Sequence, residues 1–396
     1  MKNSILSLII AGLSLTFLSC KKEYPKPKNT AVCELATADH PKNSAYQAVL
    51  DELTTKGFVG LSLLTETPED GIWMGASGMA SIEDDVKMTP CHLHHTASLY
   101  KTFAAVIILQ LAEEGHFNLE DKASTYLPSQ IIDQLPNGND FTIEQLLSHR
   151  TGMVDVFEFD FILDFFNDPY KQYTTDELLE YVYGTKAASA VGTDFYYSDA
   201  NYILLTLIIN HFAGDFKTEA EQRIFNPLGM GETTLITSPD EVPSNVANSY
   251  WDKYGDDKLE NNSDIQAALT AGLSGTDGII SSSTDINKFT KGIFDGSLLN
   301  SSSINQLALI REVPEIEQEK HGIMGYGLGV MQVSINNSIW QGHFGNHVGS
   351  GAIMLYNPEK QQSIVVFTNT GTFFSDHIKP TFFGELLWRI STIMDA

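Results

Sequence analysis

Residues 98–115 read SLYKTFAAVIILQLAEEG, and this stretch decides how the chain is organised. Its long apolar run without proline predicts a buried helix that ends at Gly115. Ser98 and Lys101 stand three residues apart at its beginning, so their side chains share one face of the first turn. The helix macrodipole favours negative charge at this end, and a lysine whose pKa is lowered can accept the serine proton. The pattern predicts Ser98 as a nucleophile activated by Lys101, although a serine here can also be a plain helix cap.

Strand patterns lie towards both ends of the chain. The expected strands are residues 58–66 and 72–80, which form a hairpin, then 92–96, 326–335, 338–345, 351–356 and 363–369. The expected helices near the ends are residues 42–56 and 382–394, and the middle, about 115–310, is mostly helical in pattern. We expect an α/β (α+β) fold in which a mostly antiparallel sheet, built from both chain ends and flanked by helices, carries an inserted helical lobe. A cleft between the two lobes is the natural place for a ligand.

Composition excludes several classes of function. The 396 residues include 24 Lys plus Arg and 50 Asp plus Glu, a net charge of −26. Nucleic-acid binding needs clustered basic residues, so we expect no nucleic-acid partner. The same charge argues against docking on anionic lipid through the domain itself. With 42% hydrophobic residues the chain can build a full core, and 3 cysteines are too few for a disulfide scaffold.

The N-terminus predicts export. Residues 1–19 carry Lys2 and then an apolar run too short to span a bilayer, which is typical of a signal peptide. Small Ser19 followed by Cys20 resembles a bacterial lipobox, which implies cleavage before Cys20, a lipid on its sulfur and attachment to the membrane of the cell envelope. An ordinary signal peptide and an uncleaved anchor are the alternatives. Residues 20–40 are expected to be a tether, and 41–396 one domain.

The remaining cysteines and nearby histidines leave two points open. Cys33 and Cys91 could pair in an oxidising compartment or remain separate buried thiols. In the sequence CHLHH at 91–95, strand alternation places His92 and His94 on one face. Two ligands do not make a metal site and no third is identifiable, so we expect neither a metal nor an organic cofactor.

Several short blocks, taken together, resemble one known family. In chain order they are 96–101 (TASLYK), 146–153 (LLSHRTGM), 195–199 (FYYSD), 226–230 (NPLGM), 326–329 (YGLG) and 342–345 (GHFG). Their order and types resemble the serine β-lactamases and DD-peptidases, in particular the class C β-lactamase, DD-carboxypeptidase and esterase branch. The resemblance covers about 45–392 and implies the β-lactamase/transpeptidase-like fold. It also implies that Ser98 is the nucleophile.

The resemblance implies roles for further residues. Tyr197 matches a tyrosine thought to move protons during acylation and deacylation. Asp199 replaces the asparagine of the same motif, and an ionised Asp199 would hold Lys101 charged and give Tyr197 more of the proton transfer. Ser198 and Asp199 could instead belong to a broken Ser-Asp-Asn motif, but the flanking block favours the tyrosine motif.

The family's third motif, Lys-Thr-Gly, is absent from the sequence, and His343, Phe344 and Gly345 stand in its place. His343 is expected to hydrogen-bond Tyr197 and, when protonated, to attract a carboxylate. Phe344 lacks the hydroxyl that commonly touches the substrate carboxylate, and Gly345 allows close backbone approach. The oxyanion hole implied by the resemblance is the backbone N–H of Ser98 and of Asn346.

The expected function is hydrolysis of an ester or amide bond through an acyl-enzyme, with a small-molecule or peptide substrate. A cell-envelope peptidase or esterase is favoured, because Phe344 weakens the case for β-lactams. A β-lactam hydrolase is one alternative. A non-catalytic, penicillin-binding-like envelope protein is another, favoured by Asp199 and Phe344 and opposed by the intact set of Ser98, Lys101 and Tyr197. The sequence leaves the oligomeric state open.

Overall fold

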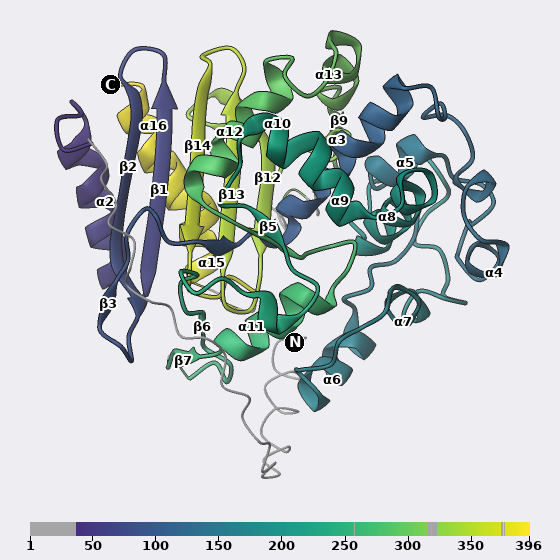
Figure 1. Ribbon diagram of the computed structural model, residues 1–396, viewed down its shortest axis with the longest axis horizontal. Coiled ribbons are helices and arrows are strands. Elements are labelled where there is room, and N and C mark those ends of the chain that lie inside the picture. The colour runs from purple at the N-terminus through teal and green to yellow at the C-terminus, as the bar shows by residue number, and fades with distance from the viewer. Residues whose placement is uncertain (1–36, 257, 316–317, 319–322, 374, 376) are drawn as a thin grey trace.

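The computed structural model describes residues 37–396 apart from 257, 316–317, 319–322, 374 and 376. Its central feature is an antiparallel sheet of nine strands in the order β3-β2-β1-β14-β13-β12-β11-β10-β9 (Figure 1). In this order the strands are β3 (Val86–Lys87), β2 (Gly71–Ser81), β1 (Gly60–Thr67), β14 (Gln362–Thr368), β13 (Gly351–Asn357), β12 (Ser338–Asn346), β11 (Met331–Ile335), β10 (Gly325–Tyr326) and β9 (Arg311–Glu312). The predicted fold is confirmed.

Helices cover the sheet and form the lobe at the right of Figure 1. The helices are α2 (Asn43–Thr55), α3 (Tyr100–Glu113), α4 (Ser129–Ile132), α5 (Ile143–Leu147), α6 (Phe159–Asn167), α7 (Thr175–Glu180), α8 (Asp199–Ala213), α9 (Phe216–Ala220), α10 (Asn226–Leu228), α11 (Ser263–Gly272), α12 (Ser283–Phe294), α13 (Ser301–Leu307), α15 (Ile378–Pro380) and α16 (Leu387–Met394). Short helical turns are η1 (Ala97–Leu99), η2 (Ala123–Thr125), η3 (Glu221–Phe225), η4 (Pro239–Glu241) and η5 (Thr381–Leu386). None of the helices in the described part of the chain is long and apolar enough to cross a membrane.

The two ends of the chain meet in the middle of the sheet. β1 pairs antiparallel with β2 in the predicted hairpin and, on its other side, with β14, where Leu63 faces Val366. In Figure 1 the purple β1 therefore lies beside the yellow-green β14. Most of the described residues between these strands form the rest of the sheet, the helical lobe and two smaller sheets, so the chain ends join in one sheet as the position of the strand patterns predicted.

Both faces of this sheet are buried. Along β14, Ile364 and Val366 pack in the core with α2 and α16, whereas Val365 and Phe367 pack in the core with α3. A strand that is covered on both sides needs apolar residues at every position rather than at alternate ones. This explains the unbroken apolar run in the sequence of β14.

A smaller sheet fixes the segment that leads into α3. It has three strands in the order β4 (His94–His95), β8 (Ile279–Ser281) and β5 (Thr234–Leu235). The predicted strand at 92–96 is thus shorter than expected, because Leu93 pairs with Val246 instead of β8 and the His92 N–H donates back to the carbonyl of Thr89. The backbone N–H and the hydroxyl of Thr96 both donate to the carbonyl of Ile279, at 3.1 and 2.9 Å. This anchor holds the chain just before Ser98.

Candidate active site

Ser98 lies in η1, the single turn that precedes α3. The residue before it, Ala97, has φ = 49°, a left-handed conformation that a residue with a Cβ seldom adopts. α3 is buried along nearly its whole length, so the turn is carried on a rigid element. The side chain of Ser98 is partly exposed, and a strained turn next to an accessible hydroxyl is typical of a functional position.

Lys101 lies one turn further on and is completely buried. Its Nζ donates to Ser98 Oγ at 3.0 Å and to Asp199 Oδ1 at 2.5 Å. Burial alone would lower the pKa of the Lys101 amine, but the Asp199 carboxylate, assisted by Tyr197, raises it above its usual value. Lys101 is therefore held as an ammonium ion, as the Asp199 substitution predicted.

Tyr197 completes the group around Ser98. Lys101 Nζ lies 5.1 Å from the centre of its ring, which stacks on His149 at 4.3 Å between ring centres. Burial raises the pKa of Tyr197 to about 12, although the Lys101 charge and a hydrogen bond with Ser98 act in the opposite direction. His149 belongs to the block at 146–153; besides this ring contact, its Nδ1 accepts the backbone N–H of Ser198 at 3.2 Å.

Asp155 is part of the site and was missed by the sequence reasoning. Its Oδ1 accepts the backbone N–H of Asp199 at 2.7 Å and that of Val156 at 2.8 Å. Burial, reinforced by the Asp199 carboxylate, raises the pKa of Asp155 to about 8. No spacing marks this aspartate, because its neighbour in the site, Asp199, lies far away in the sequence.

The structure corrects the expected partner and charge of His343. Its Nδ1 lies 2.8 Å from the carbonyl of Phe344, so Nδ1 donates, and Nε2 accepts from the Tyr326 hydroxyl at 2.9 Å. Both ring nitrogens of His343 thus have hydrogen-bond partners other than Tyr197. Burial and the Lys101 charge lower the pKa of His343 to about 3. The imidazole is neutral near pH 7, so it does not attract a carboxylate by charge.

Gly345 makes the close backbone approach that its lack of a side chain allows, and Phe344 lies at the edge of the site. A Cβ on Gly345 would lie 2.3 Å from the carbonyl oxygen of Thr96, so the close backbone approach is made by the chain's own segment before Ser98. Phe344 is buried and packs on Phe383 with ring centres 4.8 Å apart. Phe344 nevertheless lines a cavity beside Ser98.

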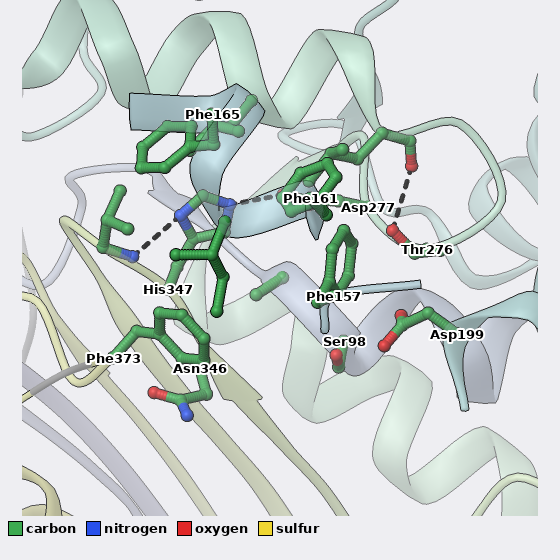
Figure 2. A pocket seen from close by; sticks show the side chains of 15 residues that line it. Ser98, Phe157, Phe161, Phe165, Asp199, Thr276, Asp277, Asn346, His347 and Phe373 are labelled. Carbon is green, nitrogen blue, oxygen red and sulfur yellow. Dashed lines mark hydrogen bonds and ion pairs between the residues drawn. The ribbon is translucent and has the colours of Figure 1, made fainter. Parts of the chain in front are cut away.

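Two cavities meet at Ser98, and Asp199 and Asn346 line both of them. The first, which we call the apolar cavity, has a volume of about 90 Å³ and aromatic and aliphatic walls (Figure 2). The second, which we call the polar cavity, has a volume of about 370 Å³ and is lined by Tyr197 and Asp155. Asn346 is the last residue of β12 and reaches the same point as Ser98, where the oxyanion hole was predicted.

The other predicted features lie apart from this site or outside the described residues. His92, His94 and His95 are buried, and His94 stacks on Phe367 at 4.8 Å. Among the residues that the structure describes, no three His, Cys, Asp or Glu side chains come together in a way that could hold a metal ion. Cys91 is disulfide-bonded. Cys20, Cys33, the signal at 1–19 and most of the tether lie outside the described residues.

Penicillin-binding proteins are among the known proteins to which the chain is similar in sequence. PbpX of Bacillus subtilis (strain 168) is 26% identical over 266 residues, which are 66% of this chain and 61% of that protein. A penicillin-binding protein of the same species is 22% identical over 340 residues, 83% of this chain and 72% of that protein. Thus the chain matches about three fifths of the length of PbpX.

Solved structures share the fold. The D-amino acid amidase from Ochrobactrum anthropi SV3, in complex with L-phenylalanine amide, has a TM-score of 0.77 and 23% identity, covering 89% of this chain and 98% of that chain. A penicillin-binding protein homologue from Pyrococcus abyssi has a TM-score of 0.73 and 21% identity, covering 90% and 78%. The family model described as Beta-lactamase matches residues 46–382, so the chain belongs to the beta-lactamase family.

Proposed function

We propose that the protein is a serine hydrolase that cleaves amide or ester bonds through an acyl-enzyme on Ser98. The observation that carries this proposal is the contact of a buried ammonium with the nucleophile, Lys101 Nζ to Ser98 Oγ at 3.0 Å, at the meeting point of two cavities. Even a paired buried charge such as Lys101 beside Asp199 adds little net stability, so a fold that served only as a scaffold would gain little from it.

The proton chemistry follows from the charges. Lys101 is held protonated by Asp199, so it stabilises negative charge near Ser98 rather than accepting a proton. In our proposal Tyr197, once deprotonated, takes the Ser98 proton while Oγ bonds to the substrate carbonyl carbon. The oxyanion is held by the backbone N–H of Ser98 and of Asn346. Tyr197 then passes the proton to the leaving nitrogen or oxygen as its bond to carbon breaks, and water releases the acyl group.

Amides, esters and peptides that place no free C-terminal carboxylate in the site are favoured as substrates over β-lactams. A β-lactam carries a carboxylate, as does a peptide with a free C-terminus, and the segment that replaces Lys-Thr-Gly offers it a neutral His343 and the ring of Phe344. The D-amino acid amidase with the same fold acts on an amide, which is consistent with this choice. We further propose that the domain works in the cell envelope, attached through a lipid on Cys20.

The test is covalent labelling followed by intact-mass measurement. The wild-type protein should gain one acyl group from p-nitrophenyl acetate or one phosphonyl group from a fluorophosphonate, and Ser98→Ala should gain neither. We expect Ser98→Ala to lose at least about a thousandfold in kcat, as is usual when a nucleophile is removed. Ser302→Ala, at an exposed position on α13, is the matched control and should behave as wild type.

Turnover of p-nitrophenyl acetate, a D-Ala-D-Ala peptide and a penicillin then ranks the substrates. Equal labelling and turnover in wild type and Ser98→Ala would show that the nucleophile is misassigned. No labelling by the fluorophosphonate or the penicillin would favour the non-catalytic alternative.

A further inference from the structure

Of the two cavities at Ser98, the polar cavity contains the proton donor of the proposed mechanism. Tyr197 lines the polar cavity and does not line the apolar cavity. In the proposed mechanism the leaving group must receive its proton from Tyr197, so the leaving group lies in the polar cavity. The acyl group remains bonded to Ser98 Oγ and points the other way, into the apolar cavity.

The walls of the apolar cavity are built before any ligand arrives. Phe161 and Phe165 on α6 are 6% and 5% exposed and lie one helical turn apart, and Phe157 precedes the helix by a similar step. The rings of Phe157 and Phe161 meet edge to face at 4.7 Å, and Leu269 on α11 also lines the cavity. Figure 2 shows the three phenylalanine side chains above Ser98. Packed rings of this kind bind apolar groups without first having to be ordered.

His347 and Asp277 are the polar pair in the wall of this cavity. His347 Nδ1 accepts the backbone N–H of Val348 at 3.0 Å, so Nε2 carries the proton and lies 3.2 Å from Asp277 Oδ2. Asp277 Oδ1 accepts the N–H of Gly278 at 2.7 Å. Asp199 is paired with Lys101. His347 Nε2 and Asp277 Oδ2 face each other without making a hydrogen bond, and the rest of the wall is formed mainly by aromatic and aliphatic side chains. Recognition of a ligand in this cavity is therefore mainly apolar.

The size of the cavity limits what it can take. Its volume is about 90 Å³, whereas a cavity of about 150 Å³ holds a benzene molecule. A branched aliphatic side chain fits inside, a phenyl ring enters only in part, and a methyl group leaves most of the space empty. The cavity thus selects by chain length and branching.

We propose that the apolar cavity is the acyl-group subsite, and that the substrate is an amide or ester whose acyl group carries a branched aliphatic side chain of about valine to leucine size. This inference depends on the proposed acyl-enzyme on Ser98. It adds the chemical class of the acyl group and the residues that select it, with Phe161 at the centre of the wall.

The test keeps the leaving group constant and varies the acyl group. The probes are the p-nitrophenyl esters of acetic, propionic, isobutyric, isovaleric, 4-methylvaleric and phenylacetic acid. We expect kcat/KM to rise about fourfold with each added methylene up to the isovaleryl or 4-methylvaleryl ester, which corresponds to about 0.8 kcal/mol per buried methylene. The phenylacetyl ester should fall below this maximum.

Two variants and a control locate the effect. Phe161→Ala enlarges the cavity and should move the preferred acyl group to phenylacetyl, and Leu269→Phe fills the cavity and should move it to acetyl or propionyl. Phe166→Ala removes the same side chain from the same helix, but Phe166 packs on Trp251 with ring centres 6.0 Å apart and does not line the cavity. It should keep the wild-type order of esters.

Each outcome decides a different point. A kcat/KM that does not change with acyl length, or a Phe161→Ala variant with the same order of esters as Phe166→Ala, would overturn the acyl subsite while leaving the acyl-enzyme intact. If Phe161→Ala instead changed the preference among leaving groups at a fixed acyl group, the two cavities would be assigned the wrong way round. No Ser98-dependent turnover of any ester, acetate included, would reject the proposed function itself.

Discussion

Asp199 contacts Lys101 at 2.5 Å, at a position where the family's motif has an asparagine. A neutral amide would leave the charge of Lys101 unbalanced, whereas the carboxylate raises the pKa of Lys101 and also contributes to the raised pKa of Tyr197. Both groups therefore hold their protons more tightly than they would beside an asparagine. Asp199 therefore sets the pH at which the coupled pair of Lys101 and Tyr197 can accept the proton of Ser98.

Asp199→Asn should move the rising limb of the kcat/KM profile to lower pH. The Asp199 carboxylate raises the pKa of both Lys101 and Tyr197, so a neutral asparagine should lower both pKa values. A larger fraction of the pair is then deprotonated at a given pH, which moves the limb to lower pH. We expect a movement of about one to three pH units, the usual effect of one adjacent charge. Ester hydrolysis between pH 6 and pH 12, corrected for the reaction without enzyme, measures it. Asp133→Asn, at an exposed position, should leave the profile unchanged, and an unmoved limb in Asp199→Asn would contradict the proposed role of Asp199.

At the scale of elements, β12 and η1 are in direct contact at the nucleophile. Gly345 brings the backbone of β12 against the carbonyl of Thr96, and Asn346, one residue further on, reaches the cavity that holds Ser98. The two elements supply the two backbone N–H groups of the proposed oxyanion hole, so their separation decides whether both can donate to one oxygen. Gly345 has no Cβ, so the backbone of β12 can lie against the Thr96 carbonyl just before η1.

Gly345→Ala should therefore impair catalysis as well as stability. The new methyl group would overlap the Thr96 carbonyl, and forcing the two backbones apart costs about 1–3 kcal/mol of stability. We expect a Tm lower by several degrees and a kcat at least about tenfold lower, because loss of one oxyanion donor costs a hundredfold or more. Thermal unfolding and ester turnover measure the two effects.

Gly384→Ala is the matched control, since a Cβ at Gly384 meets no atom within 4 Å and the residue is exposed in η5. It should retain the wild-type kcat. A Gly345→Ala variant that lost stability but kept full kcat would show that β12 and η1 do not share the oxyanion hole.

At the scale of the whole molecule, the charge and the proposed anchor act separately. The chain carries a net charge of −26, so an anionic bilayer repels it rather than attracts it. A lipid on Cys20 would instead hold it through two acyl chains, which is enough for stable attachment. The tether at 20–40 would then separate the domain from the membrane surface.

Cys20→Ser should release the protein from the membrane. We expect the wild-type protein in the carbonate-washed membrane fraction, and the variant mostly in the soluble envelope fraction. Cys33→Ser changes the other cysteine near the N-terminus and should remain in the membrane fraction. If Cys20→Ser stayed bound as tightly as wild type, an uncleaved anchor would account for attachment better than a lipid.

The sequence by itself determined what depends on local geometry. A spacing of three residues predicted that Ser98 and Lys101 share one face of the turn, and Lys101 Nζ lies 3.0 Å from Ser98 Oγ in the structure. The apolar strand patterns at 58–66 and 363–369 predicted the sheet that joins the chain ends, and this sheet is found.

The tertiary structure alone decided the contacts between distant segments. Asp155 meets Asp199, and His343 meets Tyr326 rather than Tyr197, because packing of separate elements sets which side chains fall within hydrogen-bond distance. The two cavities at Ser98 arise in the same way, since α6 and α11 contribute walls that no local pattern connects. Local spacing thus predicted the reacting groups, and the packing of distant elements decided their charges and the shape of the space beside them.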